Sequence, residues 1–315
     1  HLPFNRNGLK FFDADGGLEH ADITALLEDA GGLDAAEASL EEIEPVDLLS
    51  LYAASLRKKI CDGVKAEDYA HPLAGLKIAV DAGNGAGGFF VEQVLKPLGA
   101  DTSGSRYLDP DGTFPNHIPN PEDKQAMEAV RQATLESHAD LGIIFDTDVD
   151  RMSAVLHDGS EVNRDAIIAM MAAILADEYP GGTVVTDSVT SDRLTRFLEE
   201  DLGMKHHRFK RGYKNVINES RRLNAEGILS PLAIETSGHG ALSENYFLDD
   251  GAYLAVKLLI AAANARRQGK QVDSLIAGLP PLFEAREYRM KIAGEGFQRY
   301  GQEVLEAFET RAQER

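Results

Sequence analysis

The sequence has little cysteine, no tryptophan and an excess of acidic over basic residues. Its 315 residues include one cysteine, Cys61, and 32 lysine and arginine residues stand against 52 aspartate and glutamate residues, a net charge of −20. A single cysteine excludes an internal disulfide and favours a reducing, cytoplasmic location. The negative charge argues against binding nucleic acid or an anionic membrane surface. No apolar run approaches the ~20 residues of a membrane span, so we expect neither kind of partner.

The first residues have neither an initiator methionine nor the pattern of a signal peptide. We therefore expect the chain to begin inside a longer protein. Basic side chains are concentrated in one short stretch, residues 206–211 together with Lys214. This stretch is either an ordinary solvated charge run or the local positive charge that an anionic small molecule would need.

Apolar runs and turn residues divide the chain into repeated strand–helix units. Leu76–Asp81 and Thr183–Asp187 each read as a buried strand ending in aspartate, followed by a helix and a Leu-Gly pair. Further strands are expected at residues 9–12, 141–145, 152–156, 228–234 and 287–292, and helices at 21–30, 45–60, 89–98 and 192–201 and from Phe297 to Phe308.

This pattern predicts an α/β fold of consecutive, related domains with mixed sheets sandwiched by helices. The expected divisions are 1–62 (the end of a first domain), 75–178, 181–280 and 283–315 (the truncated start of a fourth).

The most informative segment is the loop after the strand 141–145. Asp146, Asp148 and Asp150 occupy alternate positions, and Arg151 follows directly. Three carboxylates this close repel one another unless a cation lies among them. Oxygen ligands favour a hard divalent ion, and Mg²⁺ is the usual ion where phosphate is handled. The alternative is a solvated acidic turn.

Three other interpretations compete with a phosphate-handling metal site. Residues 83–88 satisfy the G-x-G-x-x-G pattern of dinucleotide-binding proteins, but Asp81 would put a carboxylate near the pyrophosphate, so a tight strand-to-helix turn is preferred. An EF-hand would require glycine and glutamate where Arg151 and His157 stand. A haloacid-dehalogenase-type phosphatase would use Asp146 as nucleophile and Asp249-Asp250 as its downstream acidic pair, and this is the main competing phosphoryl-transfer interpretation.

A second polar loop, Glu235-Thr236-Ser237-Gly238-His239, follows another apolar strand. Carboxylate, hydroxyl and imidazole groups suit hydrogen bonding to a polyol. Together with Asp249-Asp250-Gly251 and the basic residues 210–214, this loop indicates a sugar-phosphate site. Taken alone, such a loop is more often a polar turn.

These motifs occur in the order of the α-D-phosphohexomutases, the phosphoglucomutase/phosphomannomutase family. Residues 1–10 resemble the end of that family's phosphoserine loop, and residues 146–151 resemble its metal loop, usually Asp-Gly-Asp-Gly-Asp-Arg. The loop at 235–239 is similar to the family's sugar-specificity loop, and Gly212-Tyr213-Lys214 to a substrate-binding stretch. The resemblance extends from the first residue to about residue 292.

The resemblance implies interconversion of hexose 1-phosphate and hexose 6-phosphate, with glucose or mannose as the hexose. The reaction would use a phosphoserine, a bisphosphorylated sugar intermediate, Mg²⁺ and glucose 1,6-bisphosphate as activator. It assigns Mg²⁺ to Asp146, Asp148 and Asp150, and catalytic roles to Lys10, Arg151 and His239. The implied substrate-binding residues are Arg6, Asn7, Gly212, Lys214, Glu235, Ser237 and His239.

The chain departs from the family pattern in ways that bear on activity. The phosphoserine would precede His1, no Arg-x-Ser-Gly-Thr phosphate-binding loop occurs, and Thr147 and Val149 replace glycines of the metal loop. We therefore expect the chain alone to have negligible mutase activity. A non-catalytic sugar-phosphate-binding protein on the same scaffold is the alternative. The Glu-Thr-Ser form of the sugar loop disfavours a glucosamine phosphate, and the sequence does not specify an oligomeric state.

Overall fold

The computed structural model describes residues 8–13, 16–33, 44–284, 292 and 296–314. By its internal contacts the chain divides into two compact units, residues 1–280 and residues 281–315. The predicted strand 287–292 and the predicted substrate residues Arg6 and Asn7 lie outside the described residues, apart from Ile292. No helix in the described ranges has both the length and the apolar character needed to cross a membrane.

The first sheet of the large unit has four strands in the order β3-β4-β5-β6. Their bounds are Ile78–Asp81, Leu141–Phe145, Met152–Leu156 and Glu161–Val162. β3 runs parallel to β4, whereas β4, β5 and β6 are successively antiparallel. All residues of β3, β4 and β5 are buried, which is why they read as continuous apolar runs rather than as alternating ones. The strands predicted at 141–145 and 152–156 are confirmed residue for residue.

The second sheet has the order β10-β9-β7-β8. Its strands are β7 (Thr183–Thr186), β8 (Lys205–Arg208), β9 (Leu232–Ile234) and β10 (Gly240–Leu242). β7 is parallel to both β8 and β9, and β10 is antiparallel to β9. The strand predicted from residue 228 therefore begins only at Leu232. Pro231, which has no backbone N–H to donate to a ladder, immediately precedes it.

The two sheets repeat one plan. β3 ends at the fully buried Asp81, and the fully buried Asp187 directly follows β7. Each strand leads to a helical segment that contains a π-helical turn, η2 (Phe90–Leu95) in the first repeat and η4 (Phe197–Asp201) in the second. η3 (Lys96–Leu98) follows η2, and α5 (Asp192–Arg196) precedes η4. The mixed-sheet α/β fold expected from the sequence is confirmed.

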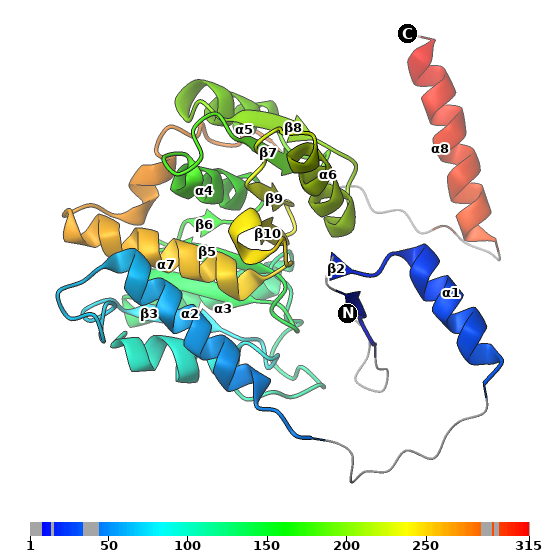
Figure 1. The fold of residues 1–315 in the computed structure, drawn as a ribbon. Helices are drawn as coiled ribbons and strands as arrows, with labels where there is room; N and C mark the ends of the chain where they lie inside the picture. Colours follow the sequence, from blue (N-terminus) through cyan, green and yellow to red (C-terminus); the bar gives the residue numbers. More distant parts are fainter. Residues whose placement is uncertain (1–7, 14–15, 34–43, 285–291, 293–295, 315) are drawn as a thin grey trace. The chain divides into compact units, whose positions relative to one another are not determined.

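Helices pack on both sheets and share a hydrophobic core with them. α3 (Lys124–Ser137) packs on β3 and β4, and α6 (Tyr213–Ala225) packs on β7 and β9. α7 (Gly251–Arg267) has 11 of its 17 residues buried and lies alongside α2 (Leu48–Val64), as Figure 1 shows. α7 also contacts α4 (Asp165–Leu175), which has eight buried residues. One hydrophobic core includes residues of both sheets and of these helices.

The remaining elements are short or peripheral. β1 (Phe12–Asp13) pairs antiparallel with β2 (Gly16–Gly17), and α1 (His20–Gly31) follows. η5 (Ser243–Asn245) and η6 (Val272–Ile276) are single 3₁₀ turns. In the small unit, α8 (Phe297–Gln313) has no buried residue, and its apolar side chains at Phe297, Tyr300, Val304, Leu305 and Phe308 are exposed.

Candidate active site

The acidic loop lies between two paired strands. Asp146 to Arg151 connect β4 to β5, whose ends are joined by the pairing of Phe145 with Met152. One carboxylate oxygen from each of Asp146, Asp148 and Asp150 lies within 4.8 Å of the others, as expected from the alternate spacing. Val149, which stands where the resembling family has glycine, adopts a left-handed backbone with φ of 67°. This conformation is unfavourable for a β-branched residue and indicates a loop held by its surroundings.

The loop is held from two sides by backbone contacts. The N–H of Ala86 donates to Thr147 O at 2.9 Å, and the N–H of Gly251 donates to Val149 O at 2.9 Å. A Cβ on Gly85 would lie 2.8 Å from Thr147 O, and one on Gly251 would lie 2.7 Å from the Arg151 carbonyl. The glycine-rich turn at 83–88 therefore allows close packing against the metal loop, as the sequence interpretation preferred over a dinucleotide site.

The electrostatics of the loop call for a cation. Asp150 Oδ1 is buried and accepts no hydrogen bond from the residues that the structure describes. Burial, together with the Asp146 carboxylate, raises the pKa of Asp150 to about 7, because both disfavour its charged form. Clustered carboxylate oxygens at this spacing fit a hard divalent ion such as Mg²⁺.

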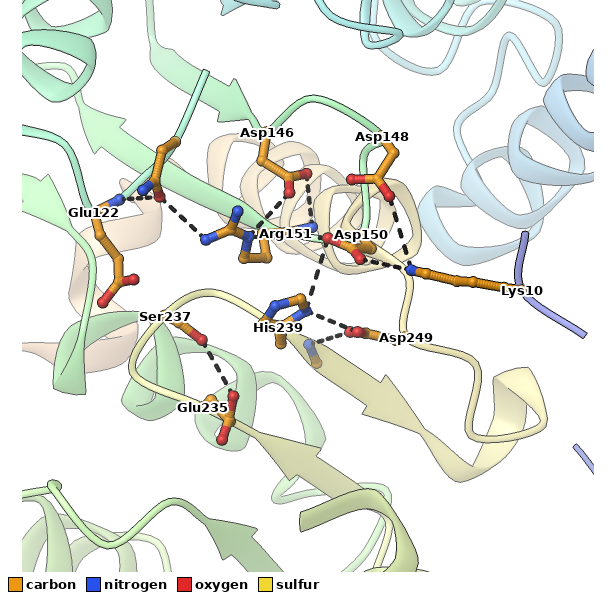
Figure 2. A network of polar contacts seen from close by, with 12 residues as sticks. Lys10, Glu122, Asp146, Asp148, Asp150, Arg151, Glu235, Ser237, His239 and Asp249 are labelled. Atoms are coloured by element: carbon orange, nitrogen blue, oxygen red, sulfur yellow. Dashed lines mark hydrogen bonds and ion pairs between the residues drawn. The ribbon is translucent and has the colours of Figure 1, made fainter. Parts of the chain in front are cut away.

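Two basic side chains of the predicted site lie against the acids. Arg151 Nε donates to Asp146 at 2.9 Å, and Lys10 Nζ donates to Asp150 at 3.3 Å and lies 3.8 Å from Asp148 (Figure 2). Burial opposes the charge on Lys10, but the carboxylates of Asp150 and Asp148 outweigh it and raise the pKa of Lys10. The hydrogen bond from Lys10 to Asp150 joins residues 140 positions apart in the sequence.

The sugar-type loop lies between β9 and β10. Glu235 is buried. Its carboxylate accepts a hydrogen bond from the Gly212 N–H at 2.6 Å and a longer one from Ser237 Oγ at 3.3 Å. Burial raises the pKa of Glu235. Lys214 donates to Leu18 O at 2.5 Å. It lines a cavity of about 300 Å³ together with Lys10, which contacts the acidic loop. The predicted Gly212 and Ser237 both contact Glu235.

His239 joins the two loops. An antiparallel β-bridge pairs His239 with Arg151, and the N–H of Met152 donates to Gly238 O at 3.2 Å. Gly238 has φ of 95°, and a Cβ there would lie 2.6 Å from Met152 O, so this position requires glycine. Figure 2 shows His239 between Asp150 and Asp249; its Nδ1 is 2.7 Å from Asp249 Oδ2 and 3.7 Å from Asp150 Oδ1. Burial opposes a charge on the ring, but these carboxylates raise the pKa of His239.

Several residues of the site were not assigned a role from the sequence. Asn120 Oδ1 accepts a hydrogen bond from Arg151 at 3.1 Å, and Glu122 accepts one from Arg211 at 3.4 Å. Asn120 stands between two prolines in the loop that leads to α3, a local signal for a rigid polar turn. Only the fold shows that this turn reaches Arg151.

The comparisons with known proteins agree with the geometry. Residues 52–159 match the family described as phosphoglucomutase/phosphomannomutase, alpha/beta/alpha domain II, and residues 163–283 match domain III of the same family. A phosphomannomutase/phosphoglucomutase of Pseudomonas putida is 30% identical over 94% of this chain and 60% of its own length. A phosphoglucosamine mutase of Rhizobium etli is 31% identical over 90% of the chain and 60% of its own length.

A solved structure leads to the same group. The crystal structure of a phosphoglucomutase/phosphomannomutase family protein from Burkholderia thailandensis has a TM-score of 0.67 and 27% identity, over 84% of this chain and 53% of that one. The chain thus spans about 60% of the length of the curated relatives it matches.

Proposed function

Because the chain belongs to the phosphoglucomutase/phosphomannomutase family, we propose that the whole protein is a phosphohexomutase. It interconverts hexose 1-phosphate and hexose 6-phosphate through a phosphoserine and a bisphosphorylated sugar intermediate, with glucose 1,6-bisphosphate as activator. The observation that carries the proposal is the β-bridge between Arg151 and His239, which joins a three-carboxylate loop to a hydroxyl-binding type of loop.

The acidic loop supplies the phosphoryl-transfer half of the site. Asp146, Asp148 and Asp150 would hold Mg²⁺, which when bound supplies positive charge that offsets the negative charge of phosphoryl oxygens. Arg151 is held by Asp146 and Asn120, so its guanidinium is oriented in advance to contact a phosphoryl group. Lys10, held at Asp150, is positioned to stabilise charge or to transfer a proton.

The second loop supplies the sugar half. The hydrogen bond from Ser237 Oγ to Glu235 is long, at 3.3 Å, so both side chains can exchange that contact for sugar hydroxyl groups. Such hydroxyl contacts would be common to both orientations of a bisphosphorylated sugar. His239 would contact the sugar or its phosphate and assist proton transfer. Gly212 and Lys214 would contact the substrate from the start of α6, and we assign Arg6 and Asn7 the same role from the family pattern.

The substrate is proposed to be a glucose or mannose phosphate. Curated relatives of similar identity act, by their names, on mannose, glucose and glucosamine phosphates, so the choice among hexoses depends on the sugar loop. We retain glucose and mannose because the loop reads Glu-Thr-Ser and lacks the glutamine common in glucosamine-specific relatives. A cytoplasmic location fits these substrates and the single cysteine.

The proposal is tested on the full-length protein. It is incubated with glucose 1,6-bisphosphate and Mg²⁺, phosphorylation is mapped by peptide mass spectrometry, and turnover of glucose 1-phosphate, mannose 1-phosphate and glucosamine 1-phosphate is compared. We expect a phosphoserine immediately before His1 and activity on the first two sugars. Asp148→Asn should abolish turnover, whereas Asp158→Asn, an exposed aspartate outside the site, should not.

The alternative function is non-catalytic binding of sugar phosphates on the same scaffold. It would be favoured by tight binding of glucose 1-phosphate with no phosphoserine and no turnover of any hexose phosphate. Unchanged turnover in Asp148→Asn would remove the metal assignment while leaving the mutase activity itself intact.

A further inference from the structure

The two ring nitrogens of His239 have different surroundings. Nδ1 lies 2.7 Å from Asp249 Oδ2. Nε2 makes no hydrogen bond with any residue in the described part of the chain. The imidazole ring is also stacked on Tyr213, with ring centroids 5.1 Å apart and planes inclined by 22°. The ring is therefore fixed at one edge and on one face, and Nε2 is left without a hydrogen-bond partner among the described residues.

Asp249 is held independently of His239. Its Oδ1 accepts a hydrogen bond from the Gly240 N–H at 3.1 Å, and its backbone is bridged to Ala241. The next residue, Asp250, caps α7 by accepting from the Tyr253 N–H at 2.9 Å and accepts a second hydrogen bond from the Tyr52 hydroxyl at 2.6 Å. The carboxylate of Asp249 thus has a fixed orientation, which it imposes on the ring.

A carboxylate bound to one nitrogen of a neutral imidazole places the proton on that nitrogen, because a carboxylate accepts and cannot donate. Proton placement on Nδ1 leaves an electron pair on Nε2. The structure contains a second carboxylate near Nδ1, Asp150 at 3.7 Å, but this distance is too long for a hydrogen bond. Asp249 therefore determines the tautomer.

We infer that Asp249 is a positioning residue that holds His239 in the Nδ1–H tautomer and presents the unprotonated Nε2 to the substrate. The catalytic part of this inference rests on the proposed function, whereas the tautomer does not. Asp249 itself contacts His239 and need not touch substrate. The Asp249-Asp250 pair is thereby explained without a phosphatase mechanism.

The tautomer is tested on the 315-residue chain labelled with ¹⁵N-histidine. Long-range ¹H–¹⁵N correlation spectra are recorded with EDTA at a pH high enough to keep the ring neutral, and the His239 signals are identified by their loss in His239→Gln. We expect a protonated Nδ1 and an unprotonated Nε2 in the wild type, and a shift toward the Nε2–H tautomer in Asp249→Asn. The matched control is Asp68→Asn, which removes the carboxylate 2.9 Å from Nδ1 of the exposed His71 and should leave the His239 signals unchanged.

The catalytic consequence is tested in the full-length enzyme. Asp249→Asn should lower kcat by about 10- to 100-fold with little change in KM. A wild-type His239 protonated on Nε2 overturns the inference even if Asp249→Asn does not fold. A normal kcat in a folded Asp249→Asn enzyme overturns the positioning role. An inactive wild-type enzyme with the expected tautomer would instead count against the proposed function alone.

Discussion

Replacing Gly251 by alanine should damage the metal loop from outside it. Gly251 is the first residue of α7. A Cβ at this position would lie 2.7 Å from both the carbonyl carbon and oxygen of Arg151, and 2.9 Å from Val149 O. All three are backbone atoms, so no side-chain rotation can relieve the contact. Reaching an ordinary contact of 3.4 Å requires a separation of about 0.7 Å between helix and loop.

The loop is the part expected to move. α7 is anchored by 11 buried residues, whereas the loop is fixed mainly by backbone hydrogen bonds at its ends and middle. Metal ligands tolerate displacements of only ~0.2 Å. We therefore expect Gly251→Ala to weaken Mg²⁺ binding at least ~10-fold, equivalent to about 1.4 kcal/mol. The free energy of unfolding should fall by about 1–3 kcal/mol from overpacking.

Isothermal titration with Mg²⁺ and urea unfolding in EDTA measure the two effects separately. The control is Gly31→Ala at the end of α1, where an added Cβ meets nothing within 4 Å; it should leave Mg²⁺ affinity unchanged and not destabilise the chain. The reasoning is refuted if Gly251→Ala binds Mg²⁺ as tightly as the wild type and unfolds at the same urea concentration.

Three further predictions concern the loop and the second sheet. Gly85→Ala should also weaken Mg²⁺ binding in the same titration, because its Cβ would meet Thr147 O at 2.8 Å from the other side of the loop. Asp148→Asn should abolish the Mg²⁺-dependent rise in Tm, yet change the unfolding free energy in EDTA by no more than ~0.5 kcal/mol, since its side chain is 53% exposed. Burial, with Arg208 nearby, lowers the pKa of His206 to about 4, so the unfolded chain takes up a proton that the native chain does not. The contribution of His206 to the free energy of unfolding is then complete above about pH 6.5 and decreases as the pH falls toward 4. The decrease is on the order of 1 kcal/mol at pH 5 after allowance for solvent screening. Urea unfolding at pH 7.5 and pH 5 should show a smaller loss in His206→Gln, and an equal loss would contradict the assignment.

The sequence was most informative where local chemistry decides the structure. β4 and β5 were predicted to the residue because each is an apolar run bounded by polar loop residues, and both are fully buried. The close approach of the three acids follows from their alternate spacing. The glycine-rich turn was interpreted as a packing device for the same kind of reason, since Asp81 conflicted with a bound pyrophosphate.

The sequence was least informative where distant segments meet. The contact of Lys10 with Asp150 joins residues 140 positions apart, and Asn120 contacts Arg151 only through the fold. One strand was also predicted too long: the strand expected from residue 228 begins only at Leu232, after Pro231. The helix expected at 192–201 is present over those residues, with its second half π-helical from Phe197. Residue propensities do not predict the left-handed backbone of Val149, because β-branched residues avoid that conformation. The domain divisions and the roles of the individual site residues stay predictions.

The repeated architecture explains why the two loops meet. In both sheets a central strand has a parallel neighbour on one side and an antiparallel one on the other, and the functional loop connects the central strand to its antiparallel neighbour. Asp146 and Glu235 are the first residues after β4 and β9, and Arg151 and His239 are the last before β5 and β10. The antiparallel bridge therefore pairs equivalent positions of the two repeats. An antiparallel pair has local two-fold symmetry, so two copies of one loop can meet in this way without distortion. The two copies differ in composition: one carries three carboxylates, which we propose hold a cation, and the other carries Glu235, Ser237 and His239, which we propose bind sugar hydroxyls. Since Gly238 leaves no room for a Cβ against Met152 O, a displacement of either loop should be transmitted to the other.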